Sequence, residues 1–100
     1  MTDGLSIVVP TYCEANNIVK LASTIDEVLS EARIEYELII SDDNSPDQIT
    51  VVVDQLSNNF PIKLIQADGR ERDLSLSVLD GVRAALHDNV LVMDADHSHP

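Results

Sequence analysis

The sequence is poor in aromatic residues, in basic residues and in cysteine. Its only aromatic side chains are Tyr12, Tyr36 and Phe60, too few for a domain that binds nucleic acid by stacking bases on rings. The single cysteine, Cys13, excludes an internal disulfide and fits a reducing compartment. No apolar run approaches the length of a transmembrane helix, and the polar first residues lack the basic start of a secretory leader. We therefore expect a cytoplasmic protein without membrane contact through these residues.

Acidic residues dominate the charge. The chain has 18 aspartates and glutamates against 6 lysines and arginines, a formal net charge of −12. Such a surface repels DNA, RNA and anionic lipid, which argues against a nucleic-acid partner. A hydrophobic content of 44% allows a core, and 100 residues make one domain at most. The most chemical segment, 94–100, is also the last, so we expect residues 1–100 to be part of a truncated domain.

Apolar patterning alternates between short β-branched runs and stretches with helical spacing. The runs predict buried strands at 5–10, 36–40, 61–65 and 90–93, and the spaced stretches predict helices at 18–29, 45–56 and 74–86. Strands that alternate with helices pair in parallel through crossover connections. The sequence therefore predicts an α/β fold of order β-α-β-α-β-α-β with a Rossmann-like, mostly parallel sheet. Gly81 weakens the last helix unless a neighbour packs closely against it.

Two helix starts have polar residues that can cap them. Ser45 fits an N-cap, Pro46 the first helical position, and Gln48 the last position of a capping box. Before the first helix, Asn16 or Asn17 can cap in the same way. These residues are therefore assigned to local structure.

Four polar loops follow the four predicted strands, at 11–17, 42–47, 68–73 and 94–100, so all lie at one edge of the sheet. Ligands bind at that edge in open α/β sheets. In the last loop, Asp94 and Asp96 offer two hard oxygen ligands that suit Mg²⁺ or Mn²⁺. The alternative is a solvated acidic turn. His97 and His99 lack the spacing and partners of a tetrahedral zinc site.

The first loop carries Tyr12, with a ring face and a hydroxyl, and Glu14, which can accept hydrogen bonds from a base or ribose. From this loop alone, a nucleoside contact and an ordinary helix entry are equally compatible. Cys13 has no partner for nucleophilic catalysis and is interpreted as a bystander.

The second and third loops carry opposite charges. Asp42 and Asp43 follow a strand, where a carboxylate can accept the N–H of a nucleobase. Arg70 and Arg72 stand near a helix start and can reach a diphosphate, or can pair with surface acids instead. The second loop has no glycine and the chain has no G-x-G-x-x-G, which argues against a phosphate cradle of the P-loop type and against a nicotinamide enzyme.

Taken together, these segments resemble family 2 glycosyltransferases of the dolichyl- or polyprenyl-phosphate mannosyltransferase type. The resemblance rests on four motifs that occur in the family's order. They are VVPTYCE at 8–14 followed by Asn17-Ile18, DDNSPD at 42–47, RDLS at 72–75 with VLDG at 78–81, and MDADHSHP at 93–100.

The resemblance implies a GT-A fold that binds a nucleotide-sugar donor, GDP-mannose, and transfers the sugar to a polyprenyl or dolichyl phosphate with inversion. It also implies Mg²⁺ or Mn²⁺ as cofactor, and a place at the cytoplasmic face of a membrane for the full-length protein. Asp94 and Asp96 would be the catalytic, metal-binding pair, with Ser98 as a further metal contact. Residues implied in nucleotide-sugar binding are Pro10, Tyr12, Glu14, Asp43, Arg72, Asp94, Ala95 and Asp96.

Three residues depart from the family pattern. Cys13 stands where the family usually has Asn, Asp73 where it has Gly or Lys, and His97 where it has Leu. A UDP-glucose donor, a non-catalytic nucleotide-binding module and a receiver-like signalling domain are the competing interpretations. The receiver-like one is disfavoured because its acidic pair should follow the first strand, whereas this pair follows the second.

Overall fold

The computed structural model describes residues 4–67, 71 and 73–95 and contains the seven predicted elements in the predicted order. Their bounds are β1 (Leu5–Thr11), α1 (Ala15–Glu31), β2 (Tyr36–Asp42), α2 (Ile49–Leu56), β3 (Ile62–Gln66), α3 (Leu74–Ala84) and β4 (Asn89–Val92). The strand–helix alternation is thus confirmed.

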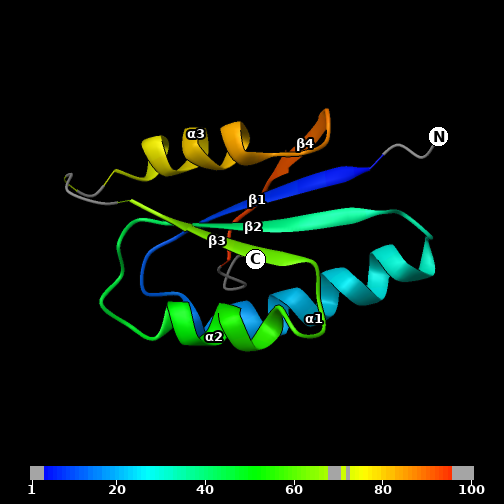
Figure 1. Ribbon diagram of the computed structural model, residues 1–100, viewed down its shortest axis with the longest axis horizontal. Coiled ribbons are helices and arrows are strands. Elements are labelled where there is room, and N and C mark those ends of the chain that lie inside the picture. The colour runs from blue at the N-terminus through cyan, green and yellow to red at the C-terminus, as the bar shows by residue number, and fades with distance from the viewer. Residues whose placement is uncertain (1–3, 68–70, 72, 96–100) are drawn as a thin grey trace, which may run out of the picture.

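The four strands form one parallel sheet in the order β3-β2-β1-β4. Helices α1 and α2 cover one face, and α3 covers the other (Figure 1). Because all strands are parallel, the loops that follow β1 and β2 leave the same end of the sheet, on the left in Figure 1. This arrangement confirms the predicted Rossmann-like half sheet.

The hydrophobic core lies between the sheet and the α1–α2 layer. Every residue of β2 is buried, and all but the first residue of β1 are buried. The apolar stripe of α1 supplies the opposing side chains, which include Ile18, Leu21 and Ile25. Burial of these aliphatic side chains stabilises the fold by roughly 1.5–3 kcal/mol for each one that is fully buried.

On the other face, Gly81 lets α3 approach β1. A Cβ atom at this position would lie 2.3 Å from Cγ1 of the fully buried Val8. Close packing against β1 therefore explains why a glycine stands inside this helix.

We expect Gly81→Ala to destabilise the protein by about 1–2 kcal/mol. Overpacking costs about 1–3 kcal/mol, which exceeds the gain of up to about 1 kcal/mol in helix propensity. Urea denaturation measures the change. Arg83→Ala on the exposed side of the same helix is the control and should be nearly neutral. A stabilised Gly81→Ala variant would contradict the close packing.

The predicted strand at 90–93 forms as β4, but its predicted burial is wrong. All four residues of β4 are exposed, with Leu91 46% accessible. Among the described residues β4 pairs only with β1, so one of its edges and much of both faces lack a covering element. The apolar run correctly predicted a strand. Burial of that strand would need a neighbouring element, which the described residues do not supply.

Both predicted helix caps are also wrong. Helix α2 begins at Ile49, four residues after Ser45, and its N-cap is Gln48 without a side-chain hydrogen bond. Helix α1 begins at Ala15 after Glu14, so the asparagines lie inside its first turn. The side chains of Ser45 and Asn17 make other hydrogen bonds, to Asp42 and to Glu14. None of the helices among the described residues is long and apolar enough to cross a bilayer.

Candidate functional site

The carboxyl ends of the strands bring the described candidate residues to one edge of the sheet. Pro10 lies in β1, buried and paired with Ser41 of β2. Tyr12 and Glu14 are partly exposed in the loop after β1, and Asp43 follows β2 directly. Parallel pairing places the ends of these two strands side by side, as Figure 1 shows.

In the first loop, backbone hydrogen bonds and a side-chain contact hold Glu14. Nδ2 of Asn17 donates to Oε2 of Glu14 at 2.6 Å, and the Glu14 carbonyl accepts from the backbone N–H groups of Asn17 and Ile18. Asn17 therefore orients the Glu14 carboxylate and does not cap the helix. This contact fixes a carboxylate at the sheet edge, where a hydrogen-bond donor on a ligand can reach it.

In the second loop, Asp42 and Asp43 have different surroundings although both are almost fully buried, at 1% and 2% exposure. Asp43 donates its backbone N–H to the carbonyl of Thr11 at 2.9 Å. The Asp42 carboxylate accepts from the side chains of Thr11, Ser45 and Gln66. From the loop pattern either aspartate could accept from a nucleobase, and the family resemblance singled out Asp43. The structure adds the contacts that the Asp42 carboxylate makes.

The loop after β2 is joined to the loop after β1 at two further points. The backbone N–H of Cys13 donates to Oγ of Ser45 at 2.9 Å. The backbone N–H of Ala15 donates to Oδ2 of Asp47 at 3.2 Å, and Oδ1 of Asp47 accepts from the N–H of Ile49 at the same distance. Asp47 thus accepts hydrogen bonds at the starts of both α1 and α2, and hydrogen bonds join the two loops to each other.

At the end of β4, the chain continues along β1. The backbone N–H of Met93 donates to the carbonyl of Val8 at 3.0 Å, which holds the segment before Asp94. Asp94 is exposed, whereas Ala95 is 2% exposed and belongs to the core cluster. An anchored alanine beside an exposed carboxylate presents that carboxylate at the sheet edge.

Asp94 has the donor chemistry that a hard divalent cation requires. The other two predicted ligands, Asp96 and Ser98, lie outside the described residues. Within the described part of the chain, no group of three or more His, Cys, Asp or Glu side chains is arranged to hold a metal ion. Of the three predicted metal ligands, the structure therefore describes Asp94 alone, as an exposed carboxylate.

In the third loop the structure describes only Glu71 and Asp73. Arg70 and Arg72 lie outside the described residues. Asp73, one of the departures from the family pattern, is the N-cap of α3, and its Oδ1 accepts from the N–H of Leu76 at 3.2 Å. Its carboxylate therefore has a local structural role, because Asp is among the preferred N-cap residues.

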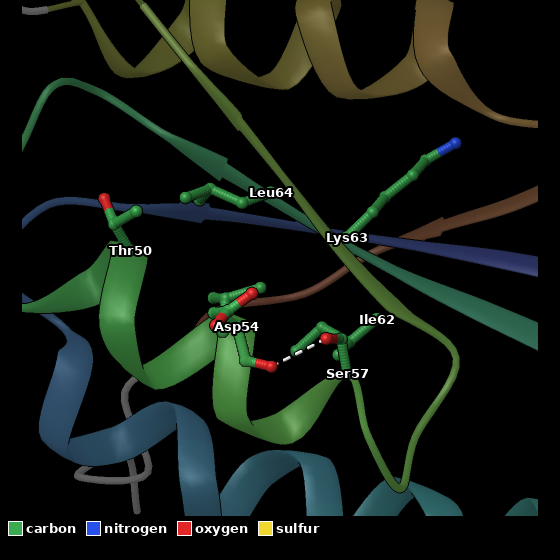
Figure 2. A pocket seen from close by; sticks show the side chains of 7 residues that line it. Thr50, Asp54, Ser57, Ile62, Lys63 and Leu64 are labelled. Carbon is green, nitrogen blue, oxygen red and sulfur yellow. Dashed lines mark hydrogen bonds between the residues drawn. The ribbon is translucent and has the colours of Figure 1, made fainter.

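A pocket between α2 and β3 lies apart from these residues. Figure 2 shows its lining, which includes Thr50, Asp54 and Ser57, with the Ser57 hydroxyl donating to the Asp54 carbonyl at 2.7 Å. Lys63 extends from β3 toward α3, where its Nζ donates to the Ala84 carbonyl at 2.9 Å. None of the predicted site residues that the structure describes lines this pocket.

Cys13 adopts a left-handed backbone conformation, with φ at 58°. This conformation costs L-residues about 1–2 kcal/mol, and Asn tolerates it better than Cys because its short side chain bonds locally. We expect Cys13→Asn to raise the free energy of unfolding by up to about 1 kcal/mol, as measured by urea denaturation. Cys13→Ala, which keeps the backbone cost, should be neutral, and equal effects of the two changes would contradict the argument.

The family model for glycosyl transferase family 2 matches residues 6–100. A dolichol-phosphate mannosyltransferase from Pyrococcus furiosus is 38% identical over 96 residues, which are 96% of this chain and 26% of that protein. A second dolichol-phosphate mannosyltransferase, from Mycosarcoma maydis, is 34% identical over 99% of this chain and 35% of its own length. The chain thus spans about a quarter to a third of the length of these curated relatives.

Solved structures agree on the fold. Mannosyltransferase PcManGT from Pyrobaculum calidifontis, in complex with GDP-Man and Mn²⁺, superposes with a TM-score of 0.75 at 22% identity, over 96% of this chain and 28% of that one. S. aureus TarS in complex with UDP gives 0.77 at 24% identity, over 93% and 27%. These neighbours confirm the GT-A expectation for the fold. With a family match along nearly its whole length, this chain belongs to glycosyl transferase family 2.

Proposed function

We propose that residues 1–100 are the nucleotide-sugar-binding part of a glycosyltransferase that moves mannose from GDP-mannose to a polyprenyl or dolichyl phosphate. The observation that carries this proposal is the gathering of Pro10, Tyr12, Glu14, Asp43 and Asp94 at the carboxyl edge of one parallel sheet. That edge is where open α/β sheets bind their ligands. The relatives named as dolichol-phosphate mannosyltransferases support this choice of donor and acceptor.

The two joined loops would bind the nucleoside. The half-buried ring of Tyr12 can pack against a base or ribose, while the carboxylates of Glu14 and Asp43 can accept hydrogen bonds from base N–H or ribose hydroxyl groups. Pro10, which is buried in β1 just before the first loop, would also contact the nucleoside. Beyond the loops, Arg72 would contact the diphosphate, and buried Ala95 would line the part of the donor site that holds the sugar.

Asp94, together with Asp96 and Ser98, would hold Mg²⁺ or Mn²⁺. The exposed Asp94 carboxylate fits such a cation, and the solved mannosyltransferase neighbour is in complex with GDP-Man and Mn²⁺. When bound, such an ion supplies Lewis-acid stabilisation of the negative charge that develops on a leaving diphosphate. Asp94 and Asp96 would therefore be the catalytic pair, because they would hold this ion.

The acceptor needs little activation. Its phosphate oxygen is already an anion, and it attacks the anomeric carbon as the bond from that carbon to the donor diphosphate breaks. The electron pair leaves with the nucleoside diphosphate, and in-line attack inverts the anomeric carbon. The full-length protein would meet this lipid at the cytoplasmic face of a membrane, through residues outside this chain.

Calorimetric titration tests the proposal. GDP, GDP-mannose, UDP and UDP-glucose are added to the folded chain, each with and without Mn²⁺. We expect metal-dependent binding of the guanosine pair. Preference for the uridine pair would replace the donor by UDP-glucose, metal-independent binding would favour a non-catalytic module, and no binding by the folded chain would overturn the proposal.

A further inference from the structure

We propose that Asp42 is a positioning residue of the donor site: its carboxylate sets the loop that presents Tyr12 and Glu14. This inference rests on the proposed function, because it assumes that those two side chains bind the nucleotide. Asp42 itself is 1% exposed, and its hydrogen bonds go to protein groups. It would therefore act through its neighbours and not by touching the donor.

The carboxylate accepts four hydrogen bonds from three different segments. Oδ1 accepts from Oγ1 of Thr11 at 2.7 Å and from the hydroxyl of Ser45. Oδ2 accepts from the backbone N–H of Ser45 at 2.7 Å and from Nε2 of Gln66 at 3.2 Å. All four contacts come from donor groups, so both carboxylate oxygens of Asp42 act as acceptors, two donors to each.

These contacts lead directly to the donor loop. Thr11 is the last residue of β1, immediately before Tyr12. Ser45, held by Asp42 through both its N–H and its hydroxyl, accepts the backbone N–H of Cys13 at 2.9 Å. Cys13 stands between Tyr12 and Glu14 and has a φ of 58°. Asp42 therefore fixes the loop on both sides of Tyr12 and supports its one left-handed residue.

If Asp42 had only a structural role, another buried carboxylate of the same strand should behave as it does. Glu37, at the other end of β2, is also a buried carboxylate, and it accepts from Ser6, Lys63 and the N–H of Leu86. It lies away from the donor loop. If Asp42 only stabilised the fold, Asp42→Asn and Glu37→Gln would affect nucleotide binding by folded protein in the same way.

The test compares these two isosteric variants. The asparagine amide can accept at one oxygen only, so two of the four donors lose their acceptor. We expect Asp42→Asn to weaken binding of GDP in the presence of Mn²⁺ about tenfold, because Tyr12 and Glu14 must then be ordered on binding. Glu37→Gln should bind GDP as the wild type does. Affinities are measured by calorimetry at a temperature at which circular dichroism shows each variant to be folded.

Amide hydrogen exchange provides a readout that needs no ligand. In Asp42→Asn the N–H of Cys13 should exchange at least about tenfold faster, while in Glu37→Gln its rate should be unchanged. Ser45→Ala, which keeps Asp42 but removes the acceptor of the Cys13 N–H, covers the case in which Asp42→Asn does not fold. Because both changes act on one chain of contacts, their combined effect on GDP affinity should be less than additive.

The outcomes separate the inference from the proposed function. A wild-type chain that is folded and binds no nucleotide overturns the proposed function and, with it, the role of Asp42 at a donor site. If the wild type binds GDP and Asp42→Asn or Ser45→Ala binds it equally well, the positioning role is wrong and the proposed function stands. Equal losses in Asp42→Asn and Glu37→Gln also overturn the positioning role.

Discussion

Replacing Asp94 by alanine is expected to abolish the metal-dependent part of nucleotide-sugar binding. Asp94 is an exposed carboxylate at the carboxyl end of β4, held in place by the hydrogen bond from Met93 to Val8 and by the buried Ala95. Without Asp94 the cation loses a protein ligand, and each 1.4 kcal/mol or so of lost binding free energy is a factor of ten in affinity. We therefore expect the gain in GDP-mannose affinity from Mn²⁺ to fall at least about 100-fold, as measured by calorimetric titration.

The other end of the same strand provides the control. Asp88 precedes β4, is exposed and lies at the opposite edge of the sheet, so Asp88→Ala removes the same charge without touching the proposed site. It should leave the Mn²⁺ effect unchanged, and neither change should alter the urea midpoint much because both side chains are exposed. Equal losses in the two variants would mean that net charge, and not a ligand, governs binding. Retained Mn²⁺ dependence in Asp94→Ala would remove Asp94 from the metal site.

The sequence was sufficient to predict the order of the elements because each has a clear apolar period. The β-branched run before Pro10 and the run 36–40 have the composition of buried strands, and both are buried. The run 90–93 has the same composition, yet the residues of β4 are exposed. Periodicity reports what a segment can bury, whereas burial itself depends on which neighbours are present.

Helix starts were predicted less well because tertiary hydrogen bonds compete with local caps. Ser45 has the residue type and spacing of an N-cap, but its hydroxyl bonds to Asp42 and accepts from Cys13. Asp47 divides its two oxygens between the starts of α1 and α2. Cys13 and Ala15, two of the partners of these side chains, are each 32 residues away in the sequence, so a local pattern gives no indication of them.

The sequence predicted where in the fold the candidate site lies, but not the hydrogen bonds that its residues make. Loops that follow parallel strands must meet at one edge, which is why Tyr12, Glu14, Asp43 and Asp94 could be grouped from the strand pattern alone. The hydrogen bonds of the Asp42 carboxylate could not be predicted, because Thr11 and Gln66, which donate to it, are 31 and 24 residues away in the sequence. Roles in ligand binding stay predictions for all of these residues.

Glu37 is expected to make the free energy of unfolding of this protein fall at acid pH. Burial taken alone raises the pKa of the Glu37 carboxyl. Hydrogen bonds from Ser6 at 2.6 Å, from the N–H of Leu86 at 2.6 Å and from Lys63, together with the charge of Lys63, outweigh burial, so the net pKa is lowered from 4.5. The folded state therefore favours the ionised carboxylate.

The sign of the pH effect follows from this direction. Because the pKa of Glu37 is lower in the folded than in the unfolded chain, its contribution to stability is complete above the unfolded value of about 4.5 and is lost as the pH falls through the folded value. Urea denaturation at intervals from pH 7 down to pH 3 measures it. Glu37→Gln should be less stable than wild type at pH 7, and its stability should fall less steeply below about pH 4.5.

Removing the Glu37 side chain should cost more than replacing it. Glu37→Ala leaves the Leu86 N–H, the Ser6 hydroxyl and the Lys63 ammonium without this acceptor, and each buried unsatisfied donor costs about 1–3 kcal/mol. Water reaches the Lys63 end, which is 39% exposed, so we expect a total loss of about 2–4 kcal/mol. That is a large part of the roughly 5–15 kcal/mol that stabilises a domain.

Glu35 is the matched control for Glu37, because it is an acid two residues away with a side chain that is 64% exposed and 3.9 Å from Nε2 of His87. Exposed pairs contribute little, so Glu35→Gln should keep the wild-type stability and the wild-type pH profile below 4.5. If Glu37→Gln kept that profile as well, the acid sensitivity would come from other carboxylates among the 18 acidic residues. A flattened profile in Glu37→Gln alone would trace it to the hydrogen bonds that join the end of α3 to β1 and β2.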